Sequence, residues 1–286
     1  MNKRGRHSPS RASFRRVRRQ GVELILARPL ERFPWLVHGF STRRGPSGDF
    51  NLGFGAKFPA DEVRANRARL LEALGTGRGM QLVALRQIHS ALIHTLDGPP
   101  AQSPTGDALM THRPGLLLAV QVADCLPILV VDRRLRVVAA VHAGWRGALA
   151  RIVEKTVGRM RAEFGTKPED ILVAIGQGIH ACCYEVGEEV STEYESQFRY
   201  AADLLAPVRE LPFSVNPAAR AERKARLDLV EANRRQFVDA GVSARHIFAH
   251  PDCTACQPAR YFSYRKEGPT GRMMGMIGIR NLVLQN

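Results

Sequence analysis

The sequence predicts a mixed α/β sandwich, in which layered mixed sheets are flanked by helices. Strand-like segments alternate with helix-like segments, several neighbouring strands are separated only by short turns, and no internal repeat is evident. Strands that mix hairpins with helical connections favour an α/β or α+β sandwich over a purely doubly wound parallel sheet. The 286 residues, 44% of them hydrophobic, suffice for a substantial core.

The elements of the first half follow from apolar periodicity and from turn residues. Strands are predicted at 22–29 and 35–45, the second running into a loop that continues to residue 55. Two acids at its start, leucines at helical spacing and a closing glycine predict a helix over 61–75. The elements predicted after it are strands at 81–89, 91–96, 116–122, 126–132 and 136–143, and a helix over 146–164.

The second half repeats this alternation. Gly165 is a suitable C-terminal cap for the helix before it. A hairpin with its turn at 267–271 is predicted over 259–282, and residues 204–225 are expected to be a flexible insertion. The other elements predicted in this half are a strand at 171–179, helices at 185–198 and 226–240, and a short strand at 246–250.

The net charge of +15 is concentrated at the N-terminus, where residues 1–20 hold eight lysines and arginines and no acid. Segments of this kind are usually solvated, so we expect a basic disordered tail at 1–20 and a single catalytic domain at 21–286. An organellar presequence would share this composition, but an over-long start is the simpler explanation. No basic stripe interleaved with aromatic residues follows the tail, so nucleic acid is not an expected partner.

Apolar runs and cysteine usage favour a cytoplasmic protein. The longest apolar run, 116–131, is shorter than the ~20 residues of a membrane span and is interrupted by polar residues and a proline. Five cysteines, an odd number, with Cys182 and Cys183 adjacent, do not resemble a disulfide framework. We therefore expect no membrane partner and a reducing compartment, and we take a monomer as the expected state.

Cys125 and His142 are predicted to face each other across a hairpin. If 126–132 and 135–141 pair across a two-residue turn at 133–134, Cys125 lies opposite His142. Directly opposed residues of an antiparallel pair have Cβ atoms about 5 Å apart, close enough to bind one zinc ion or to share one proton. Both residues lie where an apolar strand meets a loop, which is where functional sites tend to lie.

A catalytic zinc ion typically has three protein ligands and one open position for water. His89 is the candidate third ligand, because it ends the apolar segment 82–88 in the same setting of strand and loop. Such a set would lower the pKa of a bound water toward about 7 and polarise a substrate group. The structural alternatives are a cysteine that packs as a small hydrophobic residue and histidines that are hydrogen-bonded in the core.

Around these residues the sequence resembles the YfiH-like family, also called DUF152 or laccase-domain proteins. The most specific feature is ADC followed by HAGWRG, and the resemblance extends from about residue 35 to 280. A departure is Gln177, where the family usually has proline. The matching segments are VHGFSTRRG (37–45), QIHS (87–90), GDALMT (106–111), VADCLPIL (122–129), VHAGWRG (141–147), IGQGI (175–179), CYEVG (183–187), YFSYR (261–265) and TGR (270–272).

The resemblance implies the CNF1/YfiH-like fold, a mixed α/β sandwich related to predicted cysteine hydrolases. It implies one zinc ion bound by His89, Cys125 and His142. It also implies phosphorolysis of adenosine, inosine and methylthioadenosine to a free base and a pentose 1-phosphate, and deamination of adenosine to inosine. The implied partners are a purine nucleoside and phosphate.

Phosphorolysis needs a cationic or amide-rich pocket for phosphate, and deamination needs an activated water. Arg43, Arg146 and Arg265 are candidates for binding phosphate, because arginine can bind it in a bidentate manner. Surface salt bridges are the alternative for all three. Asn51 and Asp107 are candidates for orienting ribose hydroxyls, with turn capping as the alternative.

Two other enzyme classes are compatible with parts of this pattern. The laccase label suggests a copper-dependent polyphenol oxidase, but the nine histidines include no His-X-His pair, which argues against a four-copper cluster. Copper at the zinc site stays open, because copper outcompetes zinc at comparable ligands. A Cys-His hydrolase or amidase, such as one that edits peptidoglycan precursors, would use Cys125 as nucleophile and His142 as base.

Three further features have more than one interpretation. The segment CTAC at 253–256 has the spacing of half a structural zinc site, and Cys182 with Cys183 could supply the rest, although adjacent cysteines chelate one ion poorly. A redox CxxC pair is the alternative. Asp124 could orient a ligand histidine or instead accept from loop amides.

Overall fold

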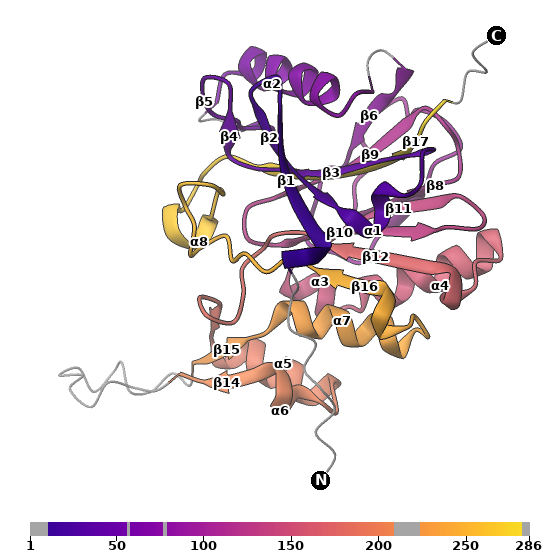
Figure 1. Ribbon diagram of the computed structural model, residues 1–286. Helices are drawn as coiled ribbons and strands as arrows, with labels where there is room; N and C mark the ends of the chain where they lie inside the picture. Colours follow the sequence, from indigo (N-terminus) through magenta and orange to yellow (C-terminus); the bar gives the residue numbers. More distant parts are fainter. Residues whose placement is uncertain (1–10, 56–57, 77–78, 209–223, 282–286) are drawn as a thin grey trace.

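Two six-stranded mixed sheets stack on each other in the computed structural model, with helices on the outer faces (Figure 1). The structure describes residues 11–55, 58–76, 79–208 and 224–281. The first sheet has the order β1 (Phe14–Arg19), β2 (Val22–Ala27), β3 (Leu36–Ser41), β17 (Met273–Ile279), β9 (Leu116–Val122) and β6 (Gln81–Ala84). The second has the order β16 (Ile247–Ala249), β12 (Ile171–Ile175), β10 (Leu126–Asp132), β11 (Val137–Ala143), β8 (Ala108–Thr111) and β7 (Ile93–Thr95). The predicted mixed sandwich is confirmed.

Both sheets are mixed, because parallel pairs occur in each. β6 runs parallel to β9, β7 to β8 and β12 to β16, while the other ladders within these two sheets are antiparallel. Parallel neighbours end at the same edge of a sheet, so the segments that follow them in the chain lie side by side. The segments that follow β6 and β9 therefore begin side by side, and they contain His89 and Cys125.

Helices cover the outer faces of the two sheets, and a small lobe lies beyond them (Figure 1). α2 (Ala60–Ala73) covers the first sheet, and α4 (Ile152–Phe164) with α7 (Leu229–Asp239) covers the second. The lobe contains α5 (Glu188–Gln197), α6 (Ala201–Leu204) and a sheet of β13 (Glu185–Val186), β15 (Ala225–Leu227) and β14 (Leu205–Pro207). The shorter elements are α1 (Arg28–Glu31), α3 (Trp145–Leu149), α8 (Tyr264–Glu267), β4 (Arg44–Gly45) and β5 (Gly48–Asp49).

The core has three apolar layers, because each sheet is buried on both faces. In β9, Leu118 and Val120 pack between the two sheets, whereas Leu117 and Ala119 pack in the layer that holds α2. The residues of β10 alternate in the same way, between the other sheet and the outer layer that holds α4 and α7. Burial on both faces explains why these strands are near-continuous apolar runs in the sequence.

The N-terminal strand corrects the prediction of a disordered tail over 1–20. β1 pairs antiparallel with β2 across a turn at Gln20 and Gly21, both of which have positive φ. Phe14 packs between the sheets, and the Arg15 guanidinium donates to Glu31. Phe14 is buried and Val17 packs partly buried in the layer that holds α2, whereas Arg16, Arg18 and Arg19 are exposed, so the strand buries its apolar residues and exposes most of its charge. Residues 1–10 lie outside the described residues.

Other predictions of elements were also wrong in part. The strand predicted at 81–89 ends at Ala84, so His89 lies in a loop. The helix predicted over 146–164 is two helices, α3 and α4, because Arg151 adopts a left-handed conformation between them. The stretch 259–282 is not a hairpin, since α8 precedes β17 and β17 pairs with β3 and β9. The insertion predicted at 204–225 begins with β14 and ends with β15, and its residues 209–223 lie outside the described part.

The hairpin of β10 and β11 has a four-residue turn instead of the predicted two-residue turn. Asp132 pairs with Val137, and the register therefore places Pro127, not Cys125, opposite His142. The Asp132 carboxylate accepts from the amides of the two residues at 134–135, both at 2.9 Å, and Arg136 closes the turn with positive φ. The register differs from the predicted one by two residues, which keeps every side chain on its predicted face.

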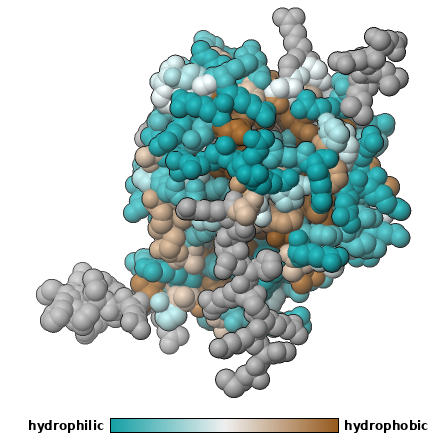
Figure 2. Space-filling model, viewed as in Figure 1, coloured by the Kyte–Doolittle hydropathy of each residue, from teal (hydrophilic) through white to brown (hydrophobic). Residues whose placement is uncertain are grey.

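No helix among the described residues is both long and apolar enough to cross a membrane. The face of the molecule seen in Figure 2 is mostly hydrophilic, with hydrophobic residues showing in smaller groups. Exposed apolar residues of this kind are normal on folded proteins.

His38 in β3 makes folding sensitive to acid. Its Nε2 lies 3.0 Å from the Ala27 amide, which donates to it, and burial lowers its pKa to about 4. Because the unfolded pKa is about 6.5, the unfolded chain binds a proton that the folded chain excludes between these values. We expect the unfolding free energy to fall by up to about 3 kcal/mol through this group as the pH drops from 7 to 4. Denaturant unfolding of wild type and His38→Gln at several pH values checks this: equal pH dependence in both would contradict it.

Candidate metal centre

Two histidines and a cysteine from different segments converge at the ends of the strands. His89 lies in the loop between β6 and β7, Cys125 in the turn from β9 to β10, and His142 near the end of β11. One donor atom from each lies within 4.8 Å of the others, and the two imidazole centroids are 4.9 Å apart at 77°. Two nitrogens and a sulfur at these separations can bind one soft divalent ion.

The crossing between the two sheets positions Cys125. β9 belongs to the first sheet and β10 to the second, so Cys125 lies where the chain passes from one sheet to the other. Extending the hairpin register places Cys125 opposite Gly144, with His142 as its diagonal neighbour on the same face. The structure therefore brings the predicted pair together, although through a register that the sequence analysis did not predict.

Gly144 leaves the space that the cysteine sulfur occupies. A Cβ at this position would lie 2.9 Å from the Cys125 sulfur and 3.3 Å from His89 Cδ2. Real Cβ atoms essentially never approach a sulfur this closely, so a side chain here must displace the sulfur or the histidine. The glycine is required by this close approach and not by its backbone angles, since its φ is −84°.

Gly144→Ala should weaken metal binding without unfolding the protein. The added methyl group moves the Cys125 sulfur away from the two imidazoles, and we expect at least a 10-fold loss of metal affinity, comparable with the loss of an outer-shell contact. Competition with a chromophoric chelator measures it. Gly158→Ala is the matched control, because a Cβ there meets nothing within 4 Å. Equal affinity in the two variants would contradict the steric explanation.

Asp107 organises two of the three candidate ligands. Its Oδ1 lies 2.8 Å from His142 Nδ1 and accepts from the His89 amide at 3.0 Å. Its Oδ2 accepts from the Ser90 amide and hydroxyl at 2.6 and 2.7 Å. The hydrogen bond to Nδ1 leaves Nε2 of His142 to face the other two residues, an arrangement typical of metal-binding histidines.

The prediction that Asp107 orients a ribose hydroxyl does not agree with its position. The residue is fully buried, directly before β8, and both carboxylate oxygens accept from residues of the site. The sequence did not indicate this role, because Asp107 is 18 residues from His89 and 35 from His142. Asp107 is a positioning residue.

Charge stabilisation within the site favours a thiolate beside an imidazolium when no metal is bound. Burial alone would raise the pKa of Cys125, but His142 and His89 lower it to about 6. Burial would lower the pKa of His142, but the charges of Cys125 and Asp107 raise it to about 9. Burial opposes ionisation of Asp107 too, and the bonds from His142 and Ser90 lower its pKa to about 2. A thiolate is the form of cysteine that binds metals and acts as a nucleophile.

Tyr184 lies close to the candidate ligands and was not predicted as a site residue. Burial raises its pKa, and the neighbouring charge of Cys125 adds to the effect. The Arg265 guanidinium lies 5.4 Å from its ring centroid and donates to the Glu185 carbonyl at 2.8 Å. Arg146 also interacts electrostatically with Tyr184. Both arginines therefore lie near this tyrosine, which in turn lies near Cys125. The segment 183–187 was the only signal for it in the sequence.

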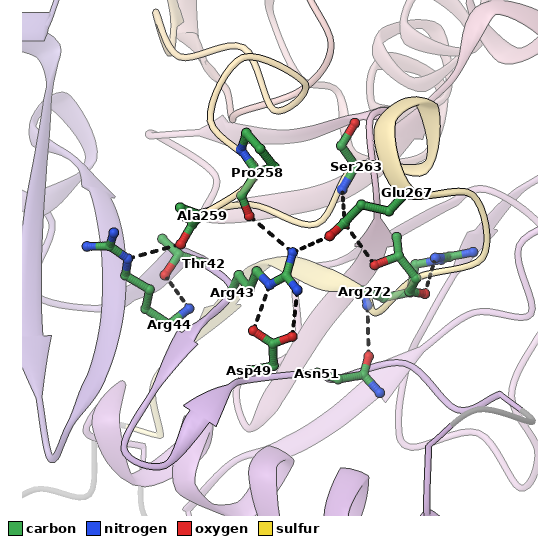
Figure 3. Close-up of polar contacts among 11 residues, drawn as sticks. Thr42, Arg43, Arg44, Asp49, Asn51, Pro258, Ala259, Ser263, Glu267 and Arg272 are labelled. Atoms are coloured by element: carbon green, nitrogen blue, oxygen red, sulfur yellow. Dashed lines mark hydrogen bonds and ion pairs between the residues drawn. The ribbon is translucent and has the colours of Figure 1, made fainter.

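Two of the predicted substrate residues are instead part of a polar network that joins two loops (Figure 3). The Arg43 guanidinium binds both carboxylate oxygens of Asp49, at 2.6 and 2.7 Å, and also donates to Glu267. The Asn51 side chain is buried and bonds with Gly53 and the Arg272 amide. These contacts give both residues a role in holding the loops together, and the binding of phosphate by Arg43 or of a ribose hydroxyl by Asn51 stays a prediction.

Asp124 and Gln177 also have structural roles. Asp124 accepts from the Thr254 hydroxyl at 2.6 Å and from the Arg265 amide at 2.7 Å, so it holds loops together and does not orient a ligand histidine. Gln177 is fully buried, and its amide donates to the Ser41 carbonyl at 2.7 Å. The glutamine therefore joins the loop after β12 to the end of β3.

The side of the site at His89 is open to solvent. His89 is exposed, and its neighbours Ile88 and Leu92 are large hydrophobic residues with exposed fractions of 46% and 52%. His142 by contrast is 3% exposed, so it forms the floor of the site. An open, partly apolar rim above a buried set of polar residues is typical of small-molecule sites.

Comparison with known proteins identifies relatives along most of the chain. The family described as multi-copper polyphenol oxidoreductase laccase matches residues 37–280. A purine nucleoside phosphorylase of Deinococcus radiodurans is 39% identical, over 88% of this chain and 93% of the relative. Adenosine deaminase RL5 from an unknown prokaryotic organism is 34% identical, over 81% of this chain and 89% of the relative. The crystal structure of the Bacillus licheniformis hypothetical protein YfiH superposes with a TM-score of 0.80 at 28% identity, over 93% of this chain and 99% of that one.

Proposed function

The chain belongs to the family described as multi-copper polyphenol oxidoreductase laccase, and from this premise we propose that it is a zinc-dependent purine nucleoside phosphorylase that also deaminates adenosine. The proposed substrates are adenosine, inosine and methylthioadenosine, which phosphate would split into a free base and a pentose 1-phosphate. The observation that carries the proposal is the open-sided set of His89, Cys125 and His142. The names of the relatives support the choice of reaction.

The donor set fits a single zinc ion. Zinc prefers nitrogen and sulfur ligands, and catalytic sites typically use three of them. Asp107 holds Nδ1 of His142, which leaves Nε2 to bind the ion. When bound, zinc would supply a Lewis acid and an activated water beside the substrate. One copper ion could occupy the same ligands. The three donors at this centre do not form the many-histidine site of a four-copper oxidase.

The chain's own residues would bind the phosphate and the nucleoside around this centre. Arg146 is exposed, and its guanidinium lies over the Trp145 ring without a hydrogen bond or ion pair to the described residues, so it can receive a phosphate. Arg265 is exposed as well and keeps donors beyond the one that bonds to Glu185. The ring of Tyr184 and the apolar side chain of Ile88 offer surfaces for a purine base.

Incubation of the pure protein with adenosine, with and without inorganic phosphate, tests the proposed reactions. We expect adenine and ribose 1-phosphate only with phosphate, and inosine in both conditions, with hypoxanthine formed from part of that inosine when phosphate is present. Separation of the products by liquid chromatography distinguishes phosphorolysis from deamination. Failure of a zinc-loaded sample to convert adenosine, inosine or methylthioadenosine in either condition would contradict the proposed function.

Removing Arg146 should weaken phosphate use selectively. A charged hydrogen bond contributes about 1.5–3 kcal/mol, so Arg146→Ala should raise the KM for phosphate about 10-fold or more and leave deamination nearly unchanged. Initial rates at several phosphate concentrations measure it. Arg64→Ala is the matched control, because Arg64 is exposed on α2 and its guanidinium pairs with its helical neighbour Asp61 alone among the described residues. An unchanged KM in Arg146→Ala would remove this residue from the phosphate site.

A Cys-His hydrolase is the second candidate, and one observation favours it. Asp107, His142 and Cys125 form a chain in which an acid orients a histidine beside a thiolate, as in cysteine hydrolases. Such an enzyme keeps its activity in a metal chelator and loses it when iodoacetamide alkylates Cys125. The zinc enzyme loses activity in the chelator and recovers when zinc is added back.

A further inference from the structure

A second cluster of soft ligands lies apart from the His89, Cys125 and His142 set. It contains Cys182, Cys183, Cys253 and Cys256, and their sulfurs all lie within 4.8 Å of one another. The sulfur of Cys256 is 3.5 Å from that of Cys182 and 3.3 Å from that of Cys183. Four thiols drawn from two separate segments therefore point at one small volume.

The sheet topology explains how these segments meet. β12 and β16 are parallel neighbours in the second sheet, and their pairing resumes beyond the strands in a bridge between Gly178 and Cys253. The segments that follow them therefore leave the sheet at the same edge. The first makes a tight turn in which the amides of Cys183 and Tyr184 both donate to the His180 carbonyl. This turn brings both adjacent cysteines to the CTAC segment. Their adjacency in the sequence alone had argued against a shared metal ion.

We propose that Cys182, Cys183, Cys253 and Cys256 bind one structural zinc ion. With Zn–S bonds of about 2.3 Å, the sulfurs of a tetrahedral site are about 3.8 Å apart, within the range of the separations seen here. Four protein ligands close the coordination shell, as in structural rather than catalytic zinc sites. The sulfurs lie too close together to enclose an iron–sulfur cluster, which must hold several irons and sulfides between them.

The surroundings of the cluster suit thiolates held in place by a metal. The His180 amide lies 3.4 Å from the Cys253 sulfur and donates to it, as amides do around bound thiolates. Cys253 is buried with Ile179 and Ala255, whereas Cys182 and Cys256 are exposed. An ion can therefore enter from the exposed side and be held against an apolar floor.

The proposed ion would stabilise the loops around the candidate active site. Thr254, between two of the cysteines, donates its hydroxyl to Asp124, whose other oxygen accepts from the Arg265 amide. Asp124 has a φ of 90°, an unfavourable value for a residue other than glycine, and directly precedes Cys125. Tyr184 directly follows Cys183. A zinc ion that fixes the CTAC segment therefore also fixes the neighbours of the candidate ligand Cys125.

Metal analysis of three proteins tests the proposal without any assay of the reaction. The samples are purified in a phosphine reductant without chelator and saturated with zinc before gel filtration. We expect two zinc ions per chain in wild type and one in the Cys253→Ser/Cys256→Ser double variant. His142→Ala, which leaves the four cysteines intact, should retain one ion. One ion in wild type together with none in His142→Ala would overturn the proposal.

Cobalt spectroscopy keeps the test decisive if the double variant fails to fold. His142→Ala loaded with cobalt should show the intense sulfur-to-cobalt charge-transfer bands of four thiolates in a tetrahedral field. Absence of these bands would overturn the proposal. Titration of thiols in the unfolded, unreduced wild-type protein should find all five cysteines free, and a disulfide among the four would indicate a redox role instead.

Loss of this ion should lower activity because the loops beside Cys125 are no longer held in place, whereas the three ligands of the candidate metal centre remain. We expect Cys253→Ser/Cys256→Ser to lose about 10-fold in kcat while keeping the ion at His89, Cys125 and His142, as outer-shell changes do. This part alone rests on the proposed function. If wild type shows no activity but two zinc ions, the reaction assignment fails and the structural site stands.

Discussion

Replacing His142 by alanine should leave the protein without the ion of the candidate metal centre and without either nucleoside activity. His142 is the most buried of the three ligands, and its Nδ1 is held 2.8 Å from Asp107. Two remaining ligands bind zinc far more weakly than three, and loss of the ion removes the Lewis acid and the activated water. We expect a loss on the order of 10³-fold or more in both phosphorolysis and deamination.

Metal content and product formation are measured on the same preparation of His142→Ala. The control is His246→Ala, which removes a partly buried histidine that lies outside the candidate ligand set. That variant should keep its metal and its rates. Circular dichroism and the melting temperature show whether each variant is folded. A folded His142→Ala with full zinc occupancy and unchanged rates would contradict the ligand assignment.

Replacing Asp107 by asparagine should weaken zinc binding by about 10- to 100-fold, although Asp107 is not a ligand. The substitution removes the charge that raises the basicity of His142, and it places an amide group opposite the amides of His89 and Ser90. Activity should return in part at saturating zinc, because the ligands themselves remain. A zinc titration followed by activity separates weaker binding from slower turnover.

Asp132→Asn is the matched control for this prediction. Asp132 is also fully buried and also accepts from backbone amides, in the turn between β10 and β11. Both variants should be less stable, because each leaves buried polar groups with poorer partners. Only Asp107→Asn should change zinc affinity. Equal zinc affinity in the two variants would show that Asp107 serves folding alone.

The sheet core could be predicted from the sequence because its strands are buried on both faces. The predicted bounds of β9 and β10 agree with the structure, since a glycine before β9, Asp124 between the two strands and Asp132 at the end of β10 interrupt the apolar runs. The strand β1 was missed because its arginines dominate the composition and its two apolar residues, Phe14 and Val17, lie on opposite faces, which leaves no alternating pattern. The hairpin register was missed because the side chain of Asp132 and the left-handed Arg136 stabilise a longer turn.

The three candidate ligands could be chosen from the sequence because an apolar segment ends beside each of them, although β6 ends at Ala84 and His89 therefore lies within a loop. The residues that position them could not, because their contacts depend on the stacking of two sheets. Asp107 bonds to segments on both sides of it in the chain, and Tyr184 lies near Cys125 only in the folded structure. The cysteine cluster depends on the parallel pairing of β12 with β16, which hydrophobic periodicity does not specify.

Anomalous diffraction from crystals of the active enzyme, measured on both sides of the zinc absorption edge, tests the proposed catalytic zinc ion directly. We predict a peak about 2.0–2.1 Å from a ring nitrogen of His89 and from Nε2 of His142, and about 2.3 Å from the sulfur of Cys125. Crystals grown from protein that converts adenosine but showing no anomalous peak among these three residues would contradict a zinc-centred active site.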